Sequence, residues 1–181
     1  MQGAFRRHCM MIESLGVPAM EVRTAGDIAS VSGLIIPGGE STVMSKLLSR
    51  NALMGTLRDR VMAGMPVFGT CAGMIIISRD AGDFGLPLVS AMDISVERNA
   101  YGRQLESFEA TFPVKGIGDN PFSGIFIRAP KITRVGAGVE VLAEFEGVPV
   151  LVREGHLLSA SFHPELTGDP RIHSLFLSMI R

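Results

Sequence analysis

The stretch with the clearest chemical content is Gly-Thr-Cys-Ala-Gly at residues 69–73, which follows an apolar strand predicted over 66–69. A strand that runs into Gly-x-Cys-x-Gly and then into an apolar helical stretch is the pattern of a nucleophile elbow, here with sulfur as the nucleophile. The sharp turn brings backbone segments together, so Gly69 and Gly73 stand where a Cβ would clash. Cys71 is then at a helix N-terminus, where the helix dipole stabilises a thiolate. Alone, the motif also fits a buried structural cysteine between two packing glycines.

A cysteine nucleophile needs a base, and the base needs a group that orients it. His163 follows a strand predicted over 157–162 and precedes Pro164-Glu165. Residues two apart in an extended chain point to the same side, so the Glu165 carboxylate can hold the His163 imidazole and stabilise its charged form. A strand-terminating turn with no catalytic role is the alternative explanation for His-Pro-Glu.

The remaining histidines and the second cysteine have no predicted part in chemistry. His8 and His173 lie on the predicted first and last helices, and both are expected on solvent-exposed faces. His156 is expected in a turn. Cys9 shares the apolar stripe of the first helix and is expected to be a packing residue.

The tetrahedral intermediate of an acyl transfer needs N–H donors for its oxyanion. In an elbow, one donor is the N–H of the residue after the nucleophile, here Ala72. The second is expected from the Gly38-Gly39 loop, because glycine lets the backbone turn its N–H toward the substrate. An ordinary loop explains the same residues, with a helix cap at Ser41 and a favourable helix-start charge on Glu40.

These residues need a sheet that brings them together. Residues 33–37 are apolar throughout, as in a parallel strand that is covered on both faces. Helical sequence separates them from the strand at 66–69, which predicts a βαβ unit and a parallel sheet. Loops at the carboxyl ends of such strands gather at one edge. The Gly38-Gly39 loop and Cys71 are therefore expected to be neighbours.

The second half of the chain predicts many strands and little helix, which indicates an antiparallel or mixed extension of the sheet. Glu146-Gly147 and Glu154-Gly155 are typical of tight hairpin turns. No linker indicates a separate domain, so residues 1–181 are expected to form one. The predicted elements are helices over 3–15, 43–50, 52–63 and 170–180, and strands over 19–23, 33–37, 66–69, 92–97, 106–115, 122–129, 139–145, 148–154 and 157–162.

The bulk composition excludes several classes of protein. The chain has 181 residues, a net charge of −1, 46% hydrophobic and 19% charged residues, as in a globular protein. Its basic residues are scattered, so neither nucleic acid nor an anionic membrane is an expected partner. No apolar run approaches the roughly 20 residues of a transmembrane helix. Two cysteines are too few for a disulfide framework, so a cytoplasmic protein with free thiols is expected.

Motifs that are weak one by one become specific when they occur together in this order. In these motifs the chain resembles the class I, triad-type glutamine amidotransferases. Within that group it resembles the PdxT/SNO family, whose members are the glutaminase subunits of pyridoxal 5′-phosphate synthase. The matching segments span nearly the whole chain and are Gln2-Gly3-Ala4, Pro37-Gly38-Gly39-Glu40-Ser41-Thr42, Gly69-Thr70-Cys71-Ala72-Gly73, Val96-Glu97-Arg98-Asn99, Tyr101-Gly102-Arg103-Gln104, Ser107-Phe108-Glu109-Ala110, Phe126-Ile127-Arg128-Ala129-Pro130 and Ser161-Phe162-His163-Pro164-Glu165-Leu166-Thr167.

The resemblance implies a fold and a reaction. The fold is the flavodoxin-like α/β fold of class I amidotransferases, a mostly parallel sheet flanked by helices with an antiparallel or mixed β extension. The implied reaction is the hydrolysis of glutamine to glutamate and ammonia through a thioester, with Cys71, His163 and Glu165 as the catalytic triad. The N–H groups of Gly39 and Ala72 are the implied oxyanion hole.

The resemblance also implies a glutamine site and a partner. The implied glutamine-binding residues are Gly39, Glu40, Ser41, Arg98, Ile127 and Arg128. An arginine suits the α-carboxylate because its planar fork donates two parallel hydrogen bonds. No metal or organic cofactor is implied. The implied partner is a PdxS/SNZ-type synthase subunit, which receives the ammonia in a hetero-oligomer that makes pyridoxal 5′-phosphate, the vitamin B6 cofactor.

One departure from the family pattern concerns the start of the chain. In the family an apolar first strand precedes Gln-Gly, whereas here Met1 stands directly before Gln2. That strand is therefore expected to be absent, with the true start upstream and a marginal fold without it. Two alternatives to an active glutaminase stay open: a cysteine hydrolase of the DJ-1/PfpI type, and a truncated, inactive amidotransferase domain.

Overall fold

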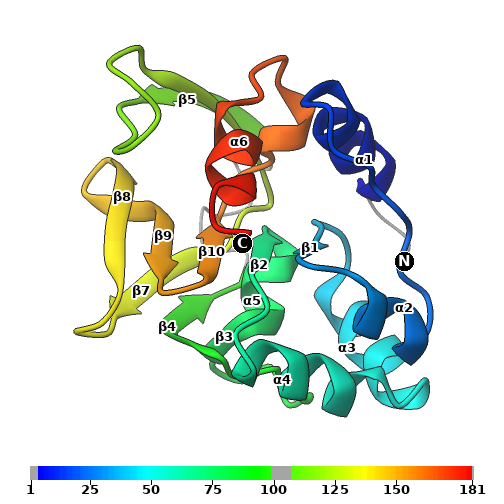
Figure 1. Ribbon diagram of the computed structural model, residues 1–181. Helices are drawn as coiled ribbons and strands as arrows, with labels where there is room; N and C mark the ends of the chain where they lie inside the picture. The colour runs from blue at the N-terminus through cyan, green and yellow to red at the C-terminus, as the bar shows by residue number, and fades with distance from the viewer. Residues whose placement is uncertain (1–3, 99–106, 181) are drawn as a thin grey trace.

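The molecule is built around a five-stranded sheet in the order β1-β2-β10-β9-β8 (Figure 1). The computed structural model describes residues 4–98 and 107–180. Strands β1, β2 and β10 run parallel, and β9 and β8 continue the sheet antiparallel. In that order, the strands are Leu34–Ile36, Val67–Thr70, Leu157–Ala160, Val148–Glu154 and Glu140–Phe145. The predicted parallel sheet with an antiparallel extension is confirmed.

Side chains alternate between two apolar cores on the two faces of this sheet. Val67 and Leu157 pack in the first core with helices α2 to α5, whereas Phe68 and Leu158 pack in the second core with helix α6. Strand β2 is buried along its whole length, as expected for a central strand. The helices are α1 Phe5–Ser14, α2 Ala25–Ser30, α3 Ser41–Arg50, α4 Leu53–Met62, α5 Ala72–Ile77, the 3₁₀ helix η1 Pro164–Leu166 and α6 Arg171–Leu177.

Two helices begin at side-chain caps. Thr24 and Asp27 form a capping box at α2, in which the Asp27 N–H donates to Thr24 Oγ1 at 3.2 Å and the Thr24 N–H donates to Asp27 Oδ2 at 2.8 Å. Glu40 caps α3 by accepting the Thr42 N–H at 3.1 Å. The second cap fixes the loop that follows β1.

Two smaller sheets, β3-β4-β7 and β5-β6, complete the β structure. In the β8–β9 hairpin, Glu146 and Gly147 have φ angles of 50° and 74°, as a two-residue type I′ turn requires. The turn predicted at Glu146-Gly147 is therefore confirmed. The strands of the smaller sheets are β3 Ser78–Asp80, β4 Met92–Glu97, β7 Lys131–Val135, β5 Ser107–Phe112 and β6 Phe122–Ile127.

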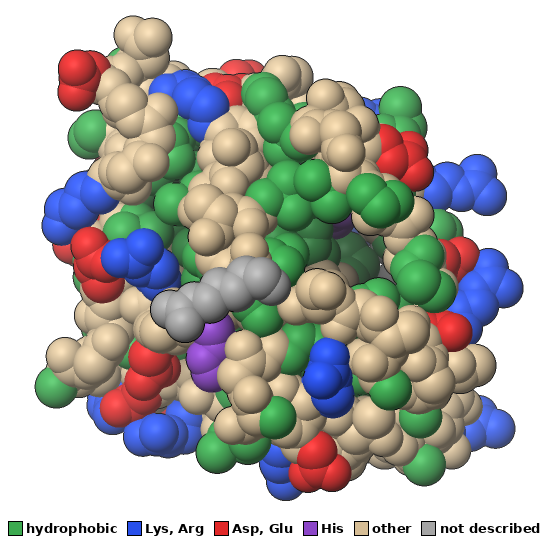
Figure 2. Space-filling view, viewed as in Figure 1, with side chains coloured by type: hydrophobic (Ala, Val, Ile, Leu, Met, Phe, Trp, Pro, Cys, Tyr) green, Lys and Arg blue, Asp and Glu red, His purple; other side chains and the backbone are tan. Residues whose placement is uncertain are grey.

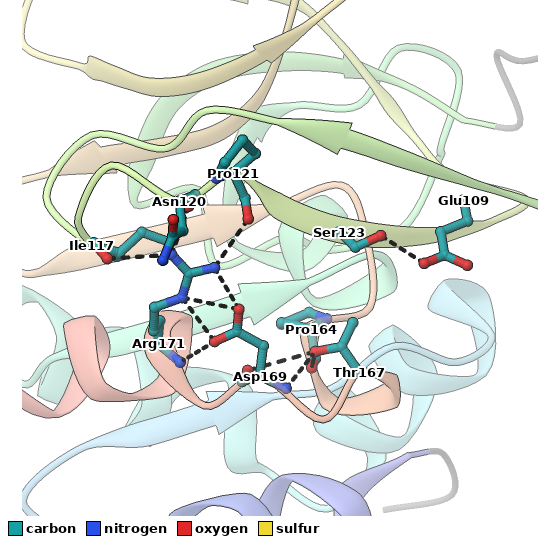
Figure 3. Close-up of polar contacts among 9 residues, drawn as sticks. All are labelled: Glu109, Ile117, Asn120, Pro121, Ser123, Pro164, Thr167, Asp169 and Arg171. Carbon is teal, nitrogen blue, oxygen red and sulfur yellow. Dashed lines mark hydrogen bonds and ion pairs between the residues drawn. The ribbon is translucent and has the colours of Figure 1, made fainter.

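A cluster of polar contacts ties the start of α6 to the loop between β5 and β6 (Figure 3). The Arg171 guanidinium donates to Asn120 O at 2.6 Å and to Pro121 O at 3.1 Å, and it binds the Asp169 carboxylate through Nη2 at 2.6 Å. The hydrogen bond from the Arg171 side chain lowers the pKa of Asp169. We call Asp169, Arg171 and the carbonyls they hold the Asp169–Arg171 clasp.

The segment 19–23, which the sequence predicts as a strand, is irregular and pairs with no strand among the described residues. A strand needs a neighbour for its N–H and C=O groups, so apolar composition alone does not make one. The sequence also fails to predict α2, β3 and β7. These elements have six, three and five residues, too few for a clear hydrophobic period.

A hydrophobic groove with a volume of about 520 Å³ lies beside β1. Its walls are α1, the segment 17–22, β1 itself and the end of α6. Figure 2 shows a recess with hydrophobic walls on this face of the molecule. Within the described part of the chain β1 pairs only with β2, so its other edge is open toward the groove.

Parts of the predicted pattern fall outside the described residues. These parts are Gln2-Gly3, Asn99, Tyr101–Gln104 and residue 106 of a predicted strand. Each helix within residues 4–98 and 107–180 is too short or too polar to span a lipid bilayer.

Candidate active site

Three parallel strands end side by side at one edge of the central sheet. The register pairs Ile36 of β1 with Gly69 of β2, and Thr70 of β2 with Ala160 of β10. Because the three strands end at the same level of the sheet, the loops that follow them lie next to one another. Those loops carry the predicted site residues Gly39, Cys71 and His163, and the predicted residue Ala72 begins helix α5 directly after Cys71.

Cys71 occupies a strained turn between β2 and α5. Its φ of 49° and ψ of −105° are in a region that costs a non-glycine residue about 1–3 kcal/mol. A Cβ on Gly69 would lie 2.7 Å from the Gly73 carbonyl group, and a Cβ on Gly73 would overlap Ile36 O. The Cys71 N–H donates to Ala160 O at 2.8 Å, which ties the turn to β10. The Gly-x-Cys-x-Gly segment therefore has the geometry of an elbow, and both glycines are sterically required.

His163 connects the cysteine to Glu165. Its Nδ1 donates to Glu165 Oε1 at 2.8 Å, and its ring is close enough to the Cys71 side chain for that group to act on its pKa. Burial alone would lower the pKa of His163, but the hydrogen bonds to Cys71 and Glu165 and their negative charges raise it to about 10. Burial acts to raise the pKa of Glu165, and the hydrogen bond from His163 overcomes it and lowers that pKa. At neutral pH a cationic imidazole thus lies between a carboxylate and a sulfur atom.

Gly38 packs directly on the His163 ring, a contact that the sequence does not predict. A Cβ at residue 38 would overlap Cε1 of His163 and lie 3.0 Å from Nδ1. The His163 main chain is held as well, because its N–H donates to Ile125 O at 2.8 Å. The ring is therefore fixed by its backbone, by the Glu165 carboxylate and by the loop after β1.

Two more histidines lie behind Glu165. His8 Nε2 is 3.3 Å from Glu165 Oε2 and 3.3 Å from Thr70 Oγ1, and His8 Nδ1 is 2.9 Å from His173 Nε2. The prediction that His8 and His173 face solvent is wrong, because their exposed fractions are 3% and 0%. A helical pattern assigns histidine to the polar face, whereas α1 and α6 bury these two against each other.

The loop after β1 brings a carboxylate close to two arginines. Glu40 accepts a hydrogen bond from Thr42 Oγ1 at 2.7 Å. This bond lowers the pKa of Glu40, and the charges of Arg98 and Arg128 lower it further. Arg98 also lies over the Phe84 ring, 5.1 Å from its centroid. A negative and two positive side chains around one loop suit a ligand that carries both charges.

Strand β6 ends beside the nucleophile. Ile127 O lies 3.8 Å from Cys71 Sγ, and the next residue, Arg128, is exposed with a φ of 43°. A positive φ in a non-glycine residue is a strained conformation of the kind that concentrates at functional sites. The structure therefore places Ile127 at the cysteine and turns the Arg128 backbone away from the strand.

Ser41, another predicted site residue, is buried at the start of α3.

Together these groups fit acyl transfer through a covalent thioester. A cysteine in this position can serve as a nucleophile, the His163 imidazolium can protonate a leaving group, and the Glu165 carboxylate can orient that imidazolium. The first N–H groups of α5, from Ala72 onward, have no intrahelical acceptor and can donate to an oxyanion. Within the described residues, no group of three or more His, Cys, Asp or Glu side chains is placed to hold a metal ion.

The sequence as a whole matches a known family. The model of the SNO glutamine amidotransferase family matches residues 1–181. The chain belongs to this family. Among SNO family relatives, the pyridoxal 5′-phosphate synthase subunit PdxT of Streptomyces avermitilis is 51% identical over 183 residues, with 100% of this chain and 91% of the relative covered. PdxT of Thermosipho africanus is 49% identical over 180 residues, with 99% and 95% covered.

Solved structures agree with the SNO family assignment. A crystal structure described as a glutamine amidotransferase has a TM-score of 0.94 and 46% identity, and the match covers 99% of this chain and 95% of the other. The structure of PurLQS from Thermotoga maritima has a TM-score of 0.66 and 14% identity, and the match covers 97% of this chain and 92% of the other, so the two share a fold. The amidotransferase fold and the family resemblance are confirmed, and the DJ-1/PfpI-type alternative is dropped.

Proposed function

We propose that this chain hydrolyses L-glutamine to L-glutamate and ammonia, with Cys71, His163 and Glu165 as its triad. The observation that carries the proposal is the line of contacts from the Cys71 thiol through His163 to Glu165, set in an elbow at the edge of a parallel sheet. Membership of a glutamine amidotransferase family supports glutamine as the substrate.

The first half of the reaction starts with the proton on His163. Its pKa of about 10 keeps the imidazole protonated at neutral pH beside the Cys71 sulfur. Sγ attacks the side-chain amide carbon of glutamine, and the negative charge that develops on the amide oxygen is held by the N–H groups of Gly39 and Ala72. The His163 proton then passes to the amide nitrogen, the C–N bond breaks, and ammonia leaves a glutamyl thioester on Cys71.

Acylation changes His163 from an acid into a base. The sulfur of the thioester is neutral, so it no longer contributes the charge that helped to raise the pKa of His163. The neutral imidazole takes a proton from water, and the resulting hydroxide adds to the thioester carbonyl. The C–S bond breaks, glutamate is released, and the pair of thiolate and imidazolium is restored.

We propose that glutamine binds between the Glu40 loop and the two arginines. Arginine suits the α-carboxylate through paired hydrogen bonds, and Glu40 suits the α-ammonium group. The charges of Arg98 and Arg128 act on Glu40, which supports one site for both ends of the amino acid. The proposed contact residues are Gly39, Glu40, Ser41, Arg98, Ile127 and Arg128.

The ammonia is proposed to pass to a PdxS/SNZ-type synthase subunit in a hetero-oligomer that makes pyridoxal 5′-phosphate. The relatives from Streptomyces avermitilis and Thermosipho africanus, each named as a subunit of that synthase, support this partner. Residues 1–181 act in this proposal as one glutaminase domain, and the hydrolysis uses no cofactor. We place the reaction in the cytoplasm, where the free thiols of Cys9 and Cys71 stay reduced.

The test measures glutamate release from glutamine, with and without the synthase subunit, for the wild type, Cys71→Ala and Cys9→Ala. We expect synthase-dependent activity that falls by at least about 10³-fold in Cys71→Ala and persists in Cys9→Ala. Activity that survives Cys71→Ala, or hydrolysis of esters or glyoxals in place of glutamine, overturns the proposal. A folded wild type without activity in the complex supports the inactive-domain alternative.

A further inference from the structure

The two histidines behind Glu165 take no part in the reaction steps above, yet they are among the most buried polar residues described. The His8 and His173 ring centroids are 5.1 Å apart, and the Phe68 ring packs edge-on against both, at 6.4 and 6.0 Å. An imidazole in such apolar surroundings is costly unless its nitrogens are hydrogen-bonded. Their hydrogen bonds therefore show what the pair does.

The Glu165 carboxylate decides which nitrogen of His8 carries the proton. Glu165 Oε2 is buried without a hydrogen-bond partner among the described residues, and His8 Nε2 lies 3.3 Å from it. A carboxylate oxygen only accepts hydrogen bonds, so a bare Nε2 would set two lone pairs against each other. We therefore assign the proton of His8 to Nε2, which hydrogen-bonds Thr70 Oγ1 at 3.3 Å and lies equally close to Glu165 Oε2.

The same reasoning decides which nitrogen of His173 carries the proton. Once His8 Nε2 is the donor, Nδ1 of the neutral ring must accept, and its partner at 2.9 Å is His173 Nε2. His173 thus donates from Nε2. Its buried Nδ1 has no partner among the described residues, which is consistent with a nitrogen that carries no proton. The contacts from Glu165 to His8 and from His8 to His173 therefore select the same tautomer in both rings, with the proton on Nε2.

Both rings are neutral at physiological pH. Burial lowers the pKa of His8 to about 4 and that of His173 to about 3, although the Glu165 charge acts to raise both. In the described residues, the titratable groups that face the pair are Glu165 of η1 and His163 before it, with Cys71 beyond His163. The positive charge of the cluster is therefore on His163, on the side of the carboxylate that faces the nucleophile.

We propose that His8 and His173 are positioning residues for the glutaminase reaction: His173 fixes the tautomer of His8, and the His8 N–H holds the second carboxylate oxygen of Glu165. This inference rests on the proposed function. Without that N–H, Glu165 is held at Oε1 alone, and the carboxylate can rotate about its last, broad torsion. A donor to the charged form also keeps the carboxylate ionised, so its loss makes Glu165 easier to protonate.

The first experiment records ¹⁵N–¹H NMR spectra of the wild-type protein with ¹⁵N-labelled histidine at pH 7. His8→Gln and His173→Gln identify the two sets of signals. We expect both rings to be neutral with the proton on Nε2. A proton on Nδ1 of His8, or a charged His8, overturns the proposal. This measurement needs no turnover, so it separates a failure of this inference from a failure of the glutaminase assignment.

The second experiment compares His8→Leu with His8→Gln in the complex with the synthase subunit. The leucine variant lacks the donor, whereas the glutamine amide can supply an N–H near the position of Nε2. We expect kcat in His8→Leu to fall by about 10- to 100-fold with KM changed less than about twofold, because the base is misplaced. We also expect the acidic limb of kcat/KM to rise by about one pH unit in His8→Leu, and His8→Gln to restore most of both.

A matched control is His156→Leu, which removes a partly buried histidine whose Nε2 bonds Val61 O at 2.8 Å far from the triad. We expect this variant to lose stability without any shift in the acidic limb. If kcat fell equally in His8→Leu and His8→Gln and the acidic limb of kcat/KM did not move, residue 8 would only fill space and the proposal would be overturned. If His8→Leu does not fold, His173→Leu and His173→Gln provide the same comparison one ring further from Glu165.

Discussion

Two carboxylates four residues apart, Glu165 and Asp169, each bind a cationic side chain, and their surroundings are opposite. The Glu165 side chain is fully buried and has one short hydrogen bond, 2.8 Å to His163. The Asp169 side chain is 28% exposed and accepts several hydrogen bonds from Arg171, whose remaining donors bind main-chain carbonyls of the neighbouring loop (Figure 3). The two clusters share a chain segment, but they differ in their exposure to water and in the number of hydrogen-bond donors around the carboxylate.

The difference separates the proposed catalytic ion pair, His163 and Glu165, from a structural one. In the clasp, many donors and nearby water satisfy the Asp169 charge, so little of it acts beyond Arg171. In the buried cluster, water is excluded and donors are few, so the field of Glu165 acts on His163 and through it on Cys71. Burial with few partners therefore makes a carboxylate useful for proton transfer, at the cost of stability.

The largest expected effect comes from making each carboxylate an amide. In Glu165→Gln the imidazole loses the negative charge that stabilises its protonated form, and the amide can turn an N–H toward Nδ1 and select the wrong tautomer. We expect kcat for glutamine hydrolysis to fall on the order of 10³-fold, measured as glutamate release in the complex. In Asp169→Asn we expect activity within a few-fold of wild type. Comparable losses in the two variants would remove the distinction between the clusters.

The next effect tests how closely His163 is held. A methyl group at residue 38 would overlap the His163 ring, so Gly38→Ala must displace the imidazole or the loop after β1. We expect about a 10²-fold loss of kcat with the protein still folded by circular dichroism. The control is Gly168→Ala next to the clasp, where a Cβ meets nothing within 4 Å. Full activity in Gly38→Ala would mean that the ring has room to move.

The two clusters should also lose stability in different pH ranges. The pKa values of His8 and His173, about 4 and about 3, lie below the usual 6.5, so between these values the unfolded chain binds protons that the folded chain does not. Unfolding free energy should therefore fall as pH drops below 6.5, on the order of 1 kcal/mol per pH unit for each histidine. The lowered pKa of Asp169 makes the clasp contribution disappear only below about pH 4.

Urea unfolding at pH 7, 6 and 5 measures this dependence. Asp169→Asn should keep the slope of unfolding free energy against pH, and His173→Gln should reduce it by about half. A wild-type protein whose stability stays flat between pH 7 and pH 5 would contradict the assignment of two neutral buried histidines.

The smallest expected effect is the removal of the clasp itself. Arg171→Met takes away the donors to Asn120 O, Pro121 O and the Asp169 carboxylate. We expect a loss of about 1–2 kcal/mol in unfolding free energy with unchanged kcat, measured by urea unfolding and glutamate release. Arg153→Met is the matched control, because it removes an exposed pair with Glu140 and should cost no more than about 1 kcal/mol.

The members of the proposed triad could be singled out from the sequence because local patterns mark them. Cys71 is flanked by two glycines that its turn requires, and Glu165 follows His163 at a spacing of two. The positions of the strands that carry them could also be predicted, since β2 and β10 are mostly apolar and are buried along their whole length. Local spacing was sufficient where a residue's partner is near in sequence or its backbone conformation demands glycine.

The support behind the triad could not be predicted in this way. His8 and His173 meet across 165 residues of sequence, and Gly38 meets His163 only after β1 and β10 are placed on either side of β2. A single sequence contains no signal for such pairs, so helical periodicity assigned both histidines to solvent. The strand predicted over 19–23 failed for a related reason, because strand formation depends on a neighbouring strand.

The backbone of Cys71 has a consequence for how this sequence can be engineered. Its φ of 49° and ψ of −105° suit glycine far better than any residue with a Cβ. Cys71→Gly would release strain of about 1–3 kcal/mol at the very position where the sulfur is needed. A search for stabilising substitutions guided by stability alone would therefore favour replacing the proposed nucleophile, and any such search on this chain has to hold residue 71 constant.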